Sequence, residues 1–452
     1  MVVFIRRCLA IVALSALISC SVFSASEKPL ASPEERPLAF PEAQGYGKFT
    51  QGGRGGRVIV VDSLEDSEKA RPGTLRYAVK AQGPRIVVFA VSGVINLVKP
   101  LEIKEDFITI AGQTSPGGIV ISGAETQIDA SQVIIRYLRF RPGSTKEQGD
   151  AINAKRLNNI IIDHCSMSWA NDEVASFYNN TDFTLQYSII SESLNNAGHA
   201  KGSHGYGGIW GGKRASFINN VLAHHISRNP RINGYRLKPN YEPAGELVDV
   251  RNNVIYNWAK NSAYGNEDGR VNFINNLYKP GPAGGDARFF LIENTQSMGQ
   301  AYFSGNVMNG SPKLSANNAL GIEIKNQKKM QNPVIEQLKS EFLVAEPFID
   351  ASTFVEHIKQ SAEMSYHNLI INREVGANRN RHGKFQDSVD SRILNDIATG
   401  KATYGNGIID SELQVIESWL AYQAEFNNEE LEKQPADSVV QVWIDTLGHF
   451  IQ

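Results

Sequence analysis

Two aspartates occupy matching places in neighbouring repeats of short apolar runs. Asp172 lies seven residues after Cys165, and Asp150 lies 22 residues before Asp172. A spacing of about one repeat would place the two carboxylates on adjacent strands, roughly 4.8 Å apart at the backbone. Carboxylates this close repel each other unless one is protonated or a cation lies between them, and Ca²⁺ prefers such oxygen ligands. The pair therefore predicts a calcium site, to which Glu173 would add a third carboxylate. Turn chemistry is the alternative, because Gly-Asp and Asn-Asp pairs also favour turns.

Arg228 lies at the corresponding place two repeats later. It follows Asn220 by eight residues in the run HHISRNPRIN. An arginine beside a bound cation creates a positive potential that favours a carboxylated sugar. The sugar carboxylate would bind the cation, which makes the proton on the adjacent carbon easier to remove. Arg228 is the predicted base for that proton, although a guanidinium gives up its own proton only in strongly cationic surroundings. A structural ion pair is the alternative interpretation.

A glycine-rich insertion between these elements holds further polar candidates. The segment NNAGHAKGSHGYGGIWGG carries His199, Lys201 and His204. Loops at a functional edge commonly carry binding residues. We therefore expect Lys201 and His204, together with Arg231, to contact sugar carboxylates. Solvated loop side chains are the alternative.

The candidate residues share one edge only if the chain repeats regularly. Seven strand-like runs align at one position, with spacings of 27, 23, 32, 33, 23 and 30 residues. A basic period in the low twenties with insertions is typical of a solenoid whose unit is one coil of short strands. The aligned residues are Leu138, Cys165, Ser188, Asn220, Asn253, Asn276 and Asn306.

Asparagine at the same position of successive repeats has a physical explanation in such a stack. Successive side-chain amides would lie one above the other and form hydrogen bonds along the axis as a ladder. An antiparallel β-sandwich would explain alternating apolar residues but gives no reason for the fixed asparagines. Continuous apolar strands also favour parallel sheets. The sequence therefore predicts an all-β solenoid of parallel strands.

The repeat also defines the expected domain organisation. We expect a signal peptide at 1–20, a linker at 21–43 and the β-solenoid at 44–313. Residues 314–452 show helical patterning instead, as in NPVIEQLKSEF and DSVDSRILNDIATG. Because this part has little continuous apolar core, we expect a partly helical C-terminal extension that packs on the solenoid.

The N-terminus has the features of an export signal. Arg6 and Arg7 precede an apolar run that is too short to span a bilayer and is followed by small residues. The run LISC, which ends at Cys20, also matches a bacterial lipobox and predicts lipid attachment there. Cleavage near Ala25 would instead release a soluble protein. We therefore expect a bacterial protein that is secreted, periplasmic or anchored to the outer membrane as a lipoprotein.

The charge of the chain excludes one class of partner. The formal net charge is -2 and there is no basic run, which argues against nucleic acid. An anionic substrate would need a local cationic patch or a metal. We expect the chain to act as a monomer.

Several motifs, in this order, resemble those of a known family. They are FPEAQGYGKFTQGGRGGRV, PGTLRYAV, ITIAGQTSPGG, VIIRYLRFR, NNIIIDHCSMSWANDE, GGIWGG, SRNPR and RNNVIYNW. Together they resemble bacterial secreted pectate lyases of the pectate lyase superfamily over residues 38–313, and the tail motif VGANRNRHGKFQDSVDSRI is similar to the C-terminal region of the same group. The resemblance implies a right-handed parallel β-helix that binds Ca²⁺. It also implies cleavage of polygalacturonate, an acidic polysaccharide, by β-elimination to unsaturated oligogalacturonides.

The resemblance further implies roles for individual residues. Arg228 occupies the position of the family's catalytic arginine in an R-x-P pattern. Asp150 and Asp172 occupy two calcium-ligand positions, one before and one after the IDH strand.

The chain departs from the family pattern at two positions. Ser176 stands where a further carboxylate is common, so Glu173 would have to substitute for it. Asn233 stands where a second arginine is common, so either Arg231 or Arg236 would compensate, or the contacts with the substrate would differ. Lys201 is the nearest match to the family's substrate-binding lysine.

Two other function classes fit part of the pattern. A glycoside hydrolase on pectin would use clustered carboxylates as acid and base. A surface solenoid that binds carbohydrate without turnover would need neither calcium nor a base. Unsaturated products that disappear with a chelator would separate the lyase from both.

Overall fold

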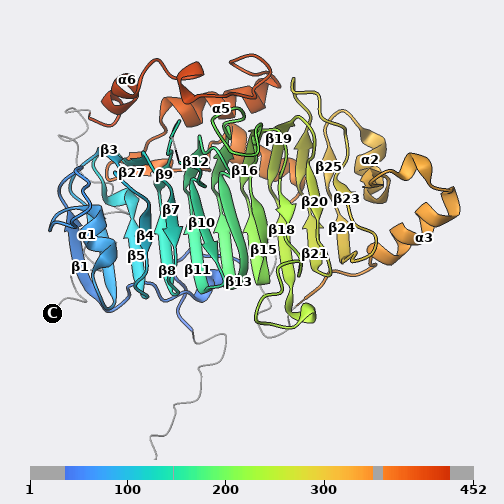
Figure 1. Ribbon diagram of the computed structural model, residues 1–452, viewed down its shortest axis with the longest axis horizontal. Coiled ribbons are helices and arrows are strands. Elements are labelled where there is room, and N and C mark those ends of the chain that lie inside the picture. The colour runs from blue at the N-terminus through green and yellow to red at the C-terminus, as the bar shows by residue number, and fades with distance from the viewer. Residues whose placement is uncertain (1–35, 146, 350–359, 428–452) are drawn as a thin grey trace, which may run out of the picture. The chain divides into compact units, whose positions relative to one another are not determined.

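The apolar runs fold as short parallel strands that wind into coils. The computed structural model describes residues 36–145, 147–349 and 360–427; the predicted signal peptide, the lipobox and part of the predicted linker lie outside these residues. Within the described residues, strand pairings in both large sheets are parallel. Parallel crossovers are right-handed with few exceptions. The fold is a right-handed parallel β-helix, as the resemblance implied, and Figure 1 shows its coils following one another from the blue strands to the yellow ones.

The strands stack in three columns. Among the described residues they form one sheet of 17 strands and one of nine, and the larger sheet contains two columns joined by the long strands β13 (Ala175–Gln186) and β15 (Ile209–Ile218). Besides these two, the first column contains β1 (Arg57–Val61), β2 (Arg85–Phe89), β5 (Ile108–Ala111), β8 (Val133–Arg136), β11 (Asn158–Asp163), β18 (Leu247–Arg251), β21 (Arg270–Ile274) and β24 (Gln300–Ser304). The second contains β4 (Leu101–Ile103), β7 (Thr126–Ile128), β10 (Ile152–Lys155), β17 (Arg231–Ile232), β20 (Ala263–Gly265), β23 (Phe290–Ile292) and β26 (Ile322–Ile324). The third, the nine-stranded sheet, contains β3 (Gly93–Asn96), β6 (Ile119–Ser122), β9 (Leu138–Phe140), β12 (Ser166–Ser168), β14 (Ile189–Ser191), β16 (Val221–His225), β19 (Val254–Trp258), β22 (Leu277–Lys279) and β25 (Val307–Met308).

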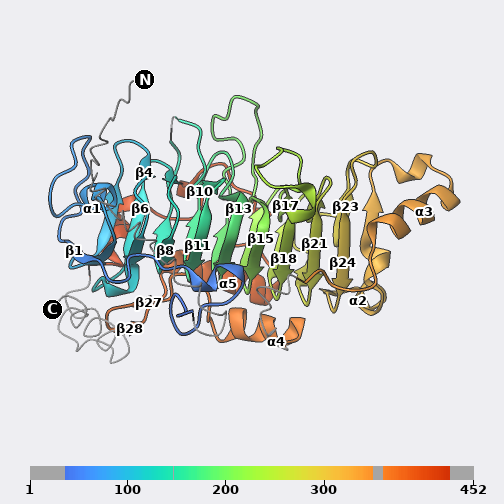
Figure 2. The ribbon, with the colours of Figure 1, turned by 90° about the horizontal axis from the view of Figure 1, so that it is seen from below.

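Short helices lie at the ends of the coils and along their outer face. The α-helices are α1 (Leu75–Lys80), α2 (Pro312–Ala316), α3 (Asn332–Phe342), α4 (Ala362–Tyr366), α5 (Ser388–Thr399) and α6 (Trp419–Ala424). Single turns of other helix types are η1 (Tyr46–Phe49), η2 (Gly112–Thr114), η3 (Pro243–Gly245), η4 (Asn318–Gly321), η5 (Gln327–Lys329), η7 (His367–Ile371) and η8 (Glu412–Gln414), and β27 (Arg379–Asn380) pairs antiparallel with β28 (Gly383–Lys384). Helix α1 lies beside the first strands and α3 beyond the last ones (Figure 2). None of the described helices is both long and apolar enough to cross a bilayer.

Left-handed residues turn the chain from the first column into the third. Each residue of the predicted alignment from Leu138 to Asn276 directly follows a non-glycine residue with a φ between 47° and 56°. Asparagine tolerates this conformation better than most residues, which explains its use in the later coils. In the earlier coils aromatic rings stack at the bend, with 5.0 Å between the ring centroids of Tyr137 and His164 and 4.9 Å between those of His164 and Tyr187. Because the bend recurs at the same position of each coil, it keeps the strands of successive coils aligned.

The aligned asparagines form the predicted ladder. The backbone N–H of Asn220 donates to Oδ1 of Asn253 at 2.8 Å, and that of Asn253 donates to Oδ1 of Asn276 at 3.0 Å. Each side-chain amide also donates to a backbone carbonyl of the previous coil. Asn318, which the alignment does not include, ends the ladder by accepting from Asn306. The ladder thus satisfies polar groups that the coils bury.

The C-terminal segment covers the outer face of the third column. Helix α5 buries Ile393 and Ile397 in a cluster with Val221 and Tyr256 of that column. Helix α5 ends at Thr399, and the next residue, Gly400, is its C-cap with a φ of 72°. In Figure 1, α5 and α6 lie along one side of the strands. The second column continues to β26, so parallel pairing extends beyond residue 313.

A buried ion network attaches α5 to the third column. Arg139 and Arg141 point outward from β9 and its end, and both contact Asp387, the N-cap of α5. Arg141 also contacts Asp390 at 2.6 Å, and all four side chains are fully buried. Burial opposes ionisation of Asp387, but the Arg141 and Arg139 guanidinium groups outweigh it and hold the pKa of this carboxyl well below its ordinary value. The network therefore links two parts of the chain that lie about 250 residues apart.

Replacing a ladder asparagine should destabilise the fold. Asn253→Ala leaves buried hydrogen-bond partners in two neighbouring coils unsatisfied, at about 1–3 kcal/mol for each group. We expect a clear drop in the urea unfolding midpoint. Asn240, which is exposed, serves as the control, because surface substitutions usually change stability by less than about 0.5 kcal/mol. Equal midpoints for the two variants would contradict a stabilising ladder.

Removing the charge of Asp387 should weaken the protein most at neutral pH. Asp387→Asn leaves two buried guanidinium groups without their shared partner, and breaking a buried pair costs roughly 3–5 kcal/mol. Because the folded-state pKa is depressed, the contribution is complete above the unfolded-state value and is lost as the pH falls through the folded-state value. The difference in urea midpoint between wild type and variant should therefore shrink in acid. Asp129→Asn, at an exposed position, is the control, and a pH-independent difference would contradict the electrostatic origin.

Candidate active site

The coil register brings the predicted carboxylates together. Strands β10 and β13 pair in parallel with Ile152 opposite Ala175, so Asp150 and Glu173, each two residues earlier, lie at the same level. The backbone N–H of Glu173 donates to Oδ1 of Asp150 at 3.2 Å. Asp172 precedes this level by one residue, and its backbone N–H donates to the Gly149 carbonyl at 3.2 Å.

The three carboxylates form a compact acidic cluster, which we define as Asp150, Asp172 and Glu173. One oxygen from each lies within 4.8 Å of the other two. Asp150 is 4% exposed, and the Asp172 side chain is 33% exposed. Burial raises the pKa of Asp150 well above its ordinary value, and the charge of Asp172 raises it further. An oxygen-only donor set with excess negative charge fits a hard divalent cation such as Ca²⁺.

Glu125 is a fourth carboxylate that the sequence analysis missed. It lies directly before β7, one coil before Asp150, and its Oε2 accepts the backbone N–H of Asp150 at 3.1 Å. Its charge also raises the pKa of Asp150. Glu125 directly precedes β7, whereas Glu173 lies two residues before β13, so the two carboxylates do not share one register position. The predicted alignment began one coil later, at Leu138.

Arg228 reaches this cluster from two coils further along the axis. Its carbonyl accepts the backbone N–H of Gly208 at 2.9 Å, and its guanidinium contacts the Glu173 carboxylate. The same guanidinium lies 4.3 Å from the ring centroid of Tyr206. The structure therefore brings the predicted base and the predicted metal ligands into contact, with Glu173 between them.

Glycines allow the loop before β15 to lie flat on the neighbouring coil. A Cβ atom at Gly208 would approach the Ala175 carbonyl oxygen to 2.0 Å, and one at Gly207 would approach the Arg228 carbonyl oxygen to 2.5 Å. Neither position can accept a side chain without moving backbone. The GYGG run therefore packs directly against the backbone of Arg228. Its Tyr206 lies close to the acidic cluster.

Two histidines of the insertion contact Asp172. His204 Nε2 lies 2.8 Å and His199 Nε2 lies 3.6 Å from Asp172 Oδ1. Their rings stack with 3.6 Å between centroids, and both side chains are almost fully buried. Burial lowers the pKa of His204, although Asp172 opposes this shift. His204 thus lies against a candidate metal ligand.

The tautomer of His199 limits what this histidine pair can do. His199 Nδ1 lies 3.1 Å from the backbone N–H of Lys201 and accepts its hydrogen bond. A neutral imidazole carries one proton, so that of His199 must lie on Nε2, which faces Asp172. A protonated Nε2 cannot coordinate a metal, and at 3.6 Å it is also beyond hydrogen-bond distance of Asp172.

The other predicted contacts lie at different places. Arg231 Nη2 donates to Glu267 Oε1 at 2.6 Å, and its guanidinium lies 5.2 Å from the centroid of the Tyr264 ring. The Arg231 side chain is only 11% exposed. Lys201 is exposed in the loop close to the histidine pair. Arg231 is therefore bound to a carboxylate of the next coil, and Lys201 faces solvent.

Comparisons with known proteins bear on the fold and the relatives of the chain. No protein-family model matches it. Over 251 residues it is 37% identical to a protein named probable pectate lyase C from Aspergillus flavus. The matched region covers 53% of this chain and 54% of that protein. Over 274 residues it is 35% identical to a probable pectate lyase C from Aspergillus terreus, which covers 59% of this chain and 58% of that one. The chain thus spans little more than half the length of these relatives.

A solved structure shares the fold. The crystal structure of jun a 1, the major allergen from cedar pollen, matches with a TM-score of 0.51 and 15% identity over 74% of this chain and 92% of that one. At this identity the match supports the β-helix fold alone.

The relatives correct the predicted source and location. Both are fungal proteins. The prediction of a bacterial periplasmic or outer-membrane lipoprotein is therefore wrong. It depended on the LISC run, a short motif that signal sequences of other origins also contain by chance. The chain is thus similar to proteins named probable pectate lyase C over little more than half of their length, and it shares the β-helix fold with jun a 1.

Proposed function

We propose that this chain is a polysaccharide lyase that cleaves polygalacturonate by β-elimination. The observation that carries the proposal is the contact of Arg228 with a cluster of three carboxylates on neighbouring coils. The names of the fungal relatives support the same substrate class.

Asp150, Asp172 and Glu173 would hold a calcium ion, with Glu125 behind Asp150. Bound there, Ca²⁺ supplies positive charge that stabilises the negative charge developing on the sugar carboxylate. The buried Asp150 would ionise once this charge is present, because its raised pKa reflects burial and the neighbouring carboxylates. The cluster thus explains why a cation is needed before an acidic sugar can approach.

Arg228 would remove the proton from the sugar carbon next to the carboxylate. The electron pair of that C–H bond forms a carbon–carbon double bond, and the glycosidic C–O bond breaks with its electrons on the leaving oxygen. That oxygen then takes a proton from water. The product is an unsaturated sugar at the new chain end.

Glu173 links the two parts of the site. Its carboxylate contacts the Arg228 guanidinium. One carboxylate cannot fully neutralise Arg228 and a metal ion at the same time. Filling the acidic cluster would therefore weaken the ion pair and make Arg228 a better base.

His199 and His204 would hold Asp172 in place. Both present Nε2 to the same carboxylate oxygen from buried, stacked rings. Only the 2.8 Å contact of His204 is short enough for a hydrogen bond, and such bonds orient metal ligands, whereas His199 packs against the His204 ring. We therefore propose that His204 positions Asp172, while the exposed Lys201 remains a candidate for contact with the sugar carboxylate.

The lyase proposal predicts strict dependence on Arg228 and on calcium. Wild type with polygalacturonate and Ca²⁺ should release products that absorb as unsaturated uronates, and a chelator should abolish this signal. Arg228→Lys should lower kcat by about a hundredfold or more, because a general base contributes roughly 10²–10⁴-fold. Its calcium affinity, measured by calorimetry, should stay close to that of wild type.

Arg156→Lys, at an exposed position, is the matched control and should retain full activity. Reducing ends without an unsaturated signal would instead indicate hydrolysis. Binding of polygalacturonate with no turnover under any condition would indicate a non-catalytic solenoid.

The positioning role of His204 has its own signature. His204→Ala should weaken calcium binding by about tenfold, because hydrogen-bond partners of metal ligands are worth roughly 10–100-fold in affinity. At saturating Ca²⁺, kcat should recover. His204→Gln keeps an N–H donor near the Nε2 position and should restore most of the calcium affinity. A higher KM for polygalacturonate with unchanged calcium affinity would show instead that His204 contacts substrate.

A further inference from the structure

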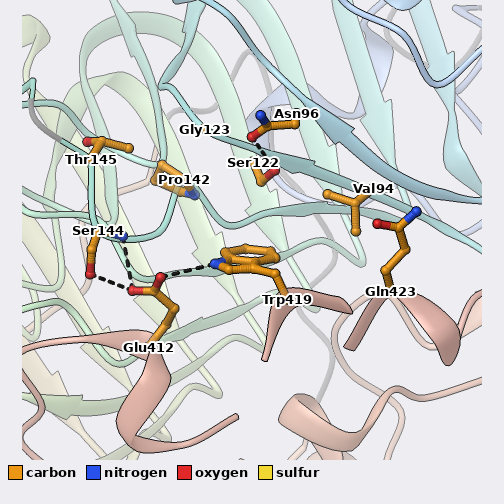
Figure 3. Close-up of a pocket in the computed structure, with 10 residues that line it drawn as sticks. All are labelled: Val94, Asn96, Ser122, Gly123, Pro142, Ser144, Thr145, Glu412, Trp419 and Gln423. Carbon is orange, nitrogen blue, oxygen red and sulfur yellow. Dashed lines mark hydrogen bonds between the residues drawn. The ribbon is translucent and has the colours of Figure 1, made fainter. Parts of the chain in front are cut away.

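A cavity lies where the C-terminal segment meets the early coils. It has a volume of about 500 Å³, within the range of roughly 300–1,000 Å³ found for small-ligand sites. Figure 3 shows Trp419 and Gln423 of α6 facing the bends that follow β3, β6 and β9. The lining residues are Val94, Asn96, Ser122, Gly123, Pro142, Ser144, Thr145, Glu412, Trp419 and Gln423.

This cavity has a smaller neighbour on the side of the proposed active site. A smaller cavity of about 140 Å³ is lined by Asp150 of the acidic cluster and by Glu125. The two cavities share Gly123, Pro142 and Thr145 in their walls. The larger cavity at Trp419 and the smaller one at Asp150 are therefore neighbours, separated by residues that line both.

The groups in the larger cavity are those that bind sugars. Trp419 offers an aromatic surface that is only half-buried. Its indole N–H donates to Glu412 Oε1 at 3.0 Å, and its ring meets the buried Trp169 edge-on at 5.6 Å between centroids. These contacts fix the ring in one orientation. Aromatic surfaces combined with a few fixed polar groups, here the amides of Asn96 and Gln423, are suited to a ligand with one apolar and several hydroxylated faces.

The charge of the cavity selects against an acidic sugar. Among its described lining residues Glu412 is the only charged one. Its carboxylate accepts hydrogen bonds from the backbone N–H of Ser144 at 3.0 Å, from the Ser144 hydroxyl at 2.6 Å and from Trp419. A uronate here would face a negative charge with no lining cation to offset it. An uncharged sugar would meet no such electrostatic repulsion.

We propose that this cavity binds an uncharged sugar unit of the same polysaccharide whose acidic units occupy the cluster at Asp150. The inference rests on the proposed function for its substrate. It makes the C-terminal segment a determinant of specificity, because α6 supplies both Trp419 and Gln423 four residues apart on one face. The chain would then prefer pectins that carry neutral sugars over pure polygalacturonate.

The preference can be measured as a ratio of kcat/KM on two substrates. Wild type should show a higher value on pectin with galactose- and arabinose-containing side chains than on polygalacturonate. Trp419→Ala and Gln423→Ala should each lower this ratio by about three- to tenfold, the effect expected of roughly 0.5–1.5 kcal/mol from one aromatic or polar contact. Leu420→Ala is the control, because Leu420 is on the same helix and is 79% exposed. Unchanged ratios in both cavity variants would overturn the proposal.

A binding measurement separates this inference from the lyase proposal. Wild type is titrated with uncharged galactose and arabinose oligosaccharides in a chelator, while tryptophan fluorescence and heat are recorded. Saturable binding that Gln423→Ala weakens supports the cavity as a sugar site even if no lyase activity exists. No binding of these oligosaccharides, with normal cleavage of polygalacturonate, overturns the inference and leaves the lyase proposal intact. If Trp419→Ala does not fold, as judged by circular dichroism, Gln423→Ala decides the outcome.

Discussion

The structure depends on the parallel hydrogen bonding between successive coils. Strands in register repeat at about 4.8 Å, so any residue type that recurs at one phase of the coil meets its equivalents directly above and below. Asn220, Asn253 and Asn276 use this constraint to satisfy one another along the axis. Asp150 and Glu173 are brought to one level by the same pairing. One geometric rule thus produces both the stabilising ladder and the acidic cluster.

The asparagine ladder and the acidic cluster differ in whether the stacked side chains attract or repel each other. Stacked amides attract because each has a donor and an acceptor, whereas stacked carboxylates have only acceptors and repel. The raised pKa of Asp150 expresses this repulsion together with burial. The fold brings these carboxylates together and also places the Arg228 guanidinium against them. The repulsion between the carboxylates gives a physical reason for a metal ion, and the guanidinium gives one for an acidic ligand at the same place.

The C-terminal segment has two roles in this arrangement. Through Asp387 and Asp390 it neutralises Arg139 and Arg141, which would otherwise lie uncompensated on the outer face of the third column. Through α6 it forms one wall of the cavity that neighbours the smaller one at Asp150. Because the same segment stabilises the coils and shapes the cavity, a change in its packing would alter both stability and ligand selection.

The sequence by itself determined the coil and its phase, because a residue repeated at one position of a stack must meet its copies. The asparagine ladder, the proximity of Asp150 and Asp172, the contact of Arg228 with the cluster and the end of α5 before Gly400 all follow from that periodicity or from local turn chemistry. Only the tertiary structure decided the rest. The orientation of His204, the Glu267 partner of Arg231 and the cavity at Trp419 depend on insertions and on the C-terminal segment. The path of such segments is set by packing that no repeat specifies.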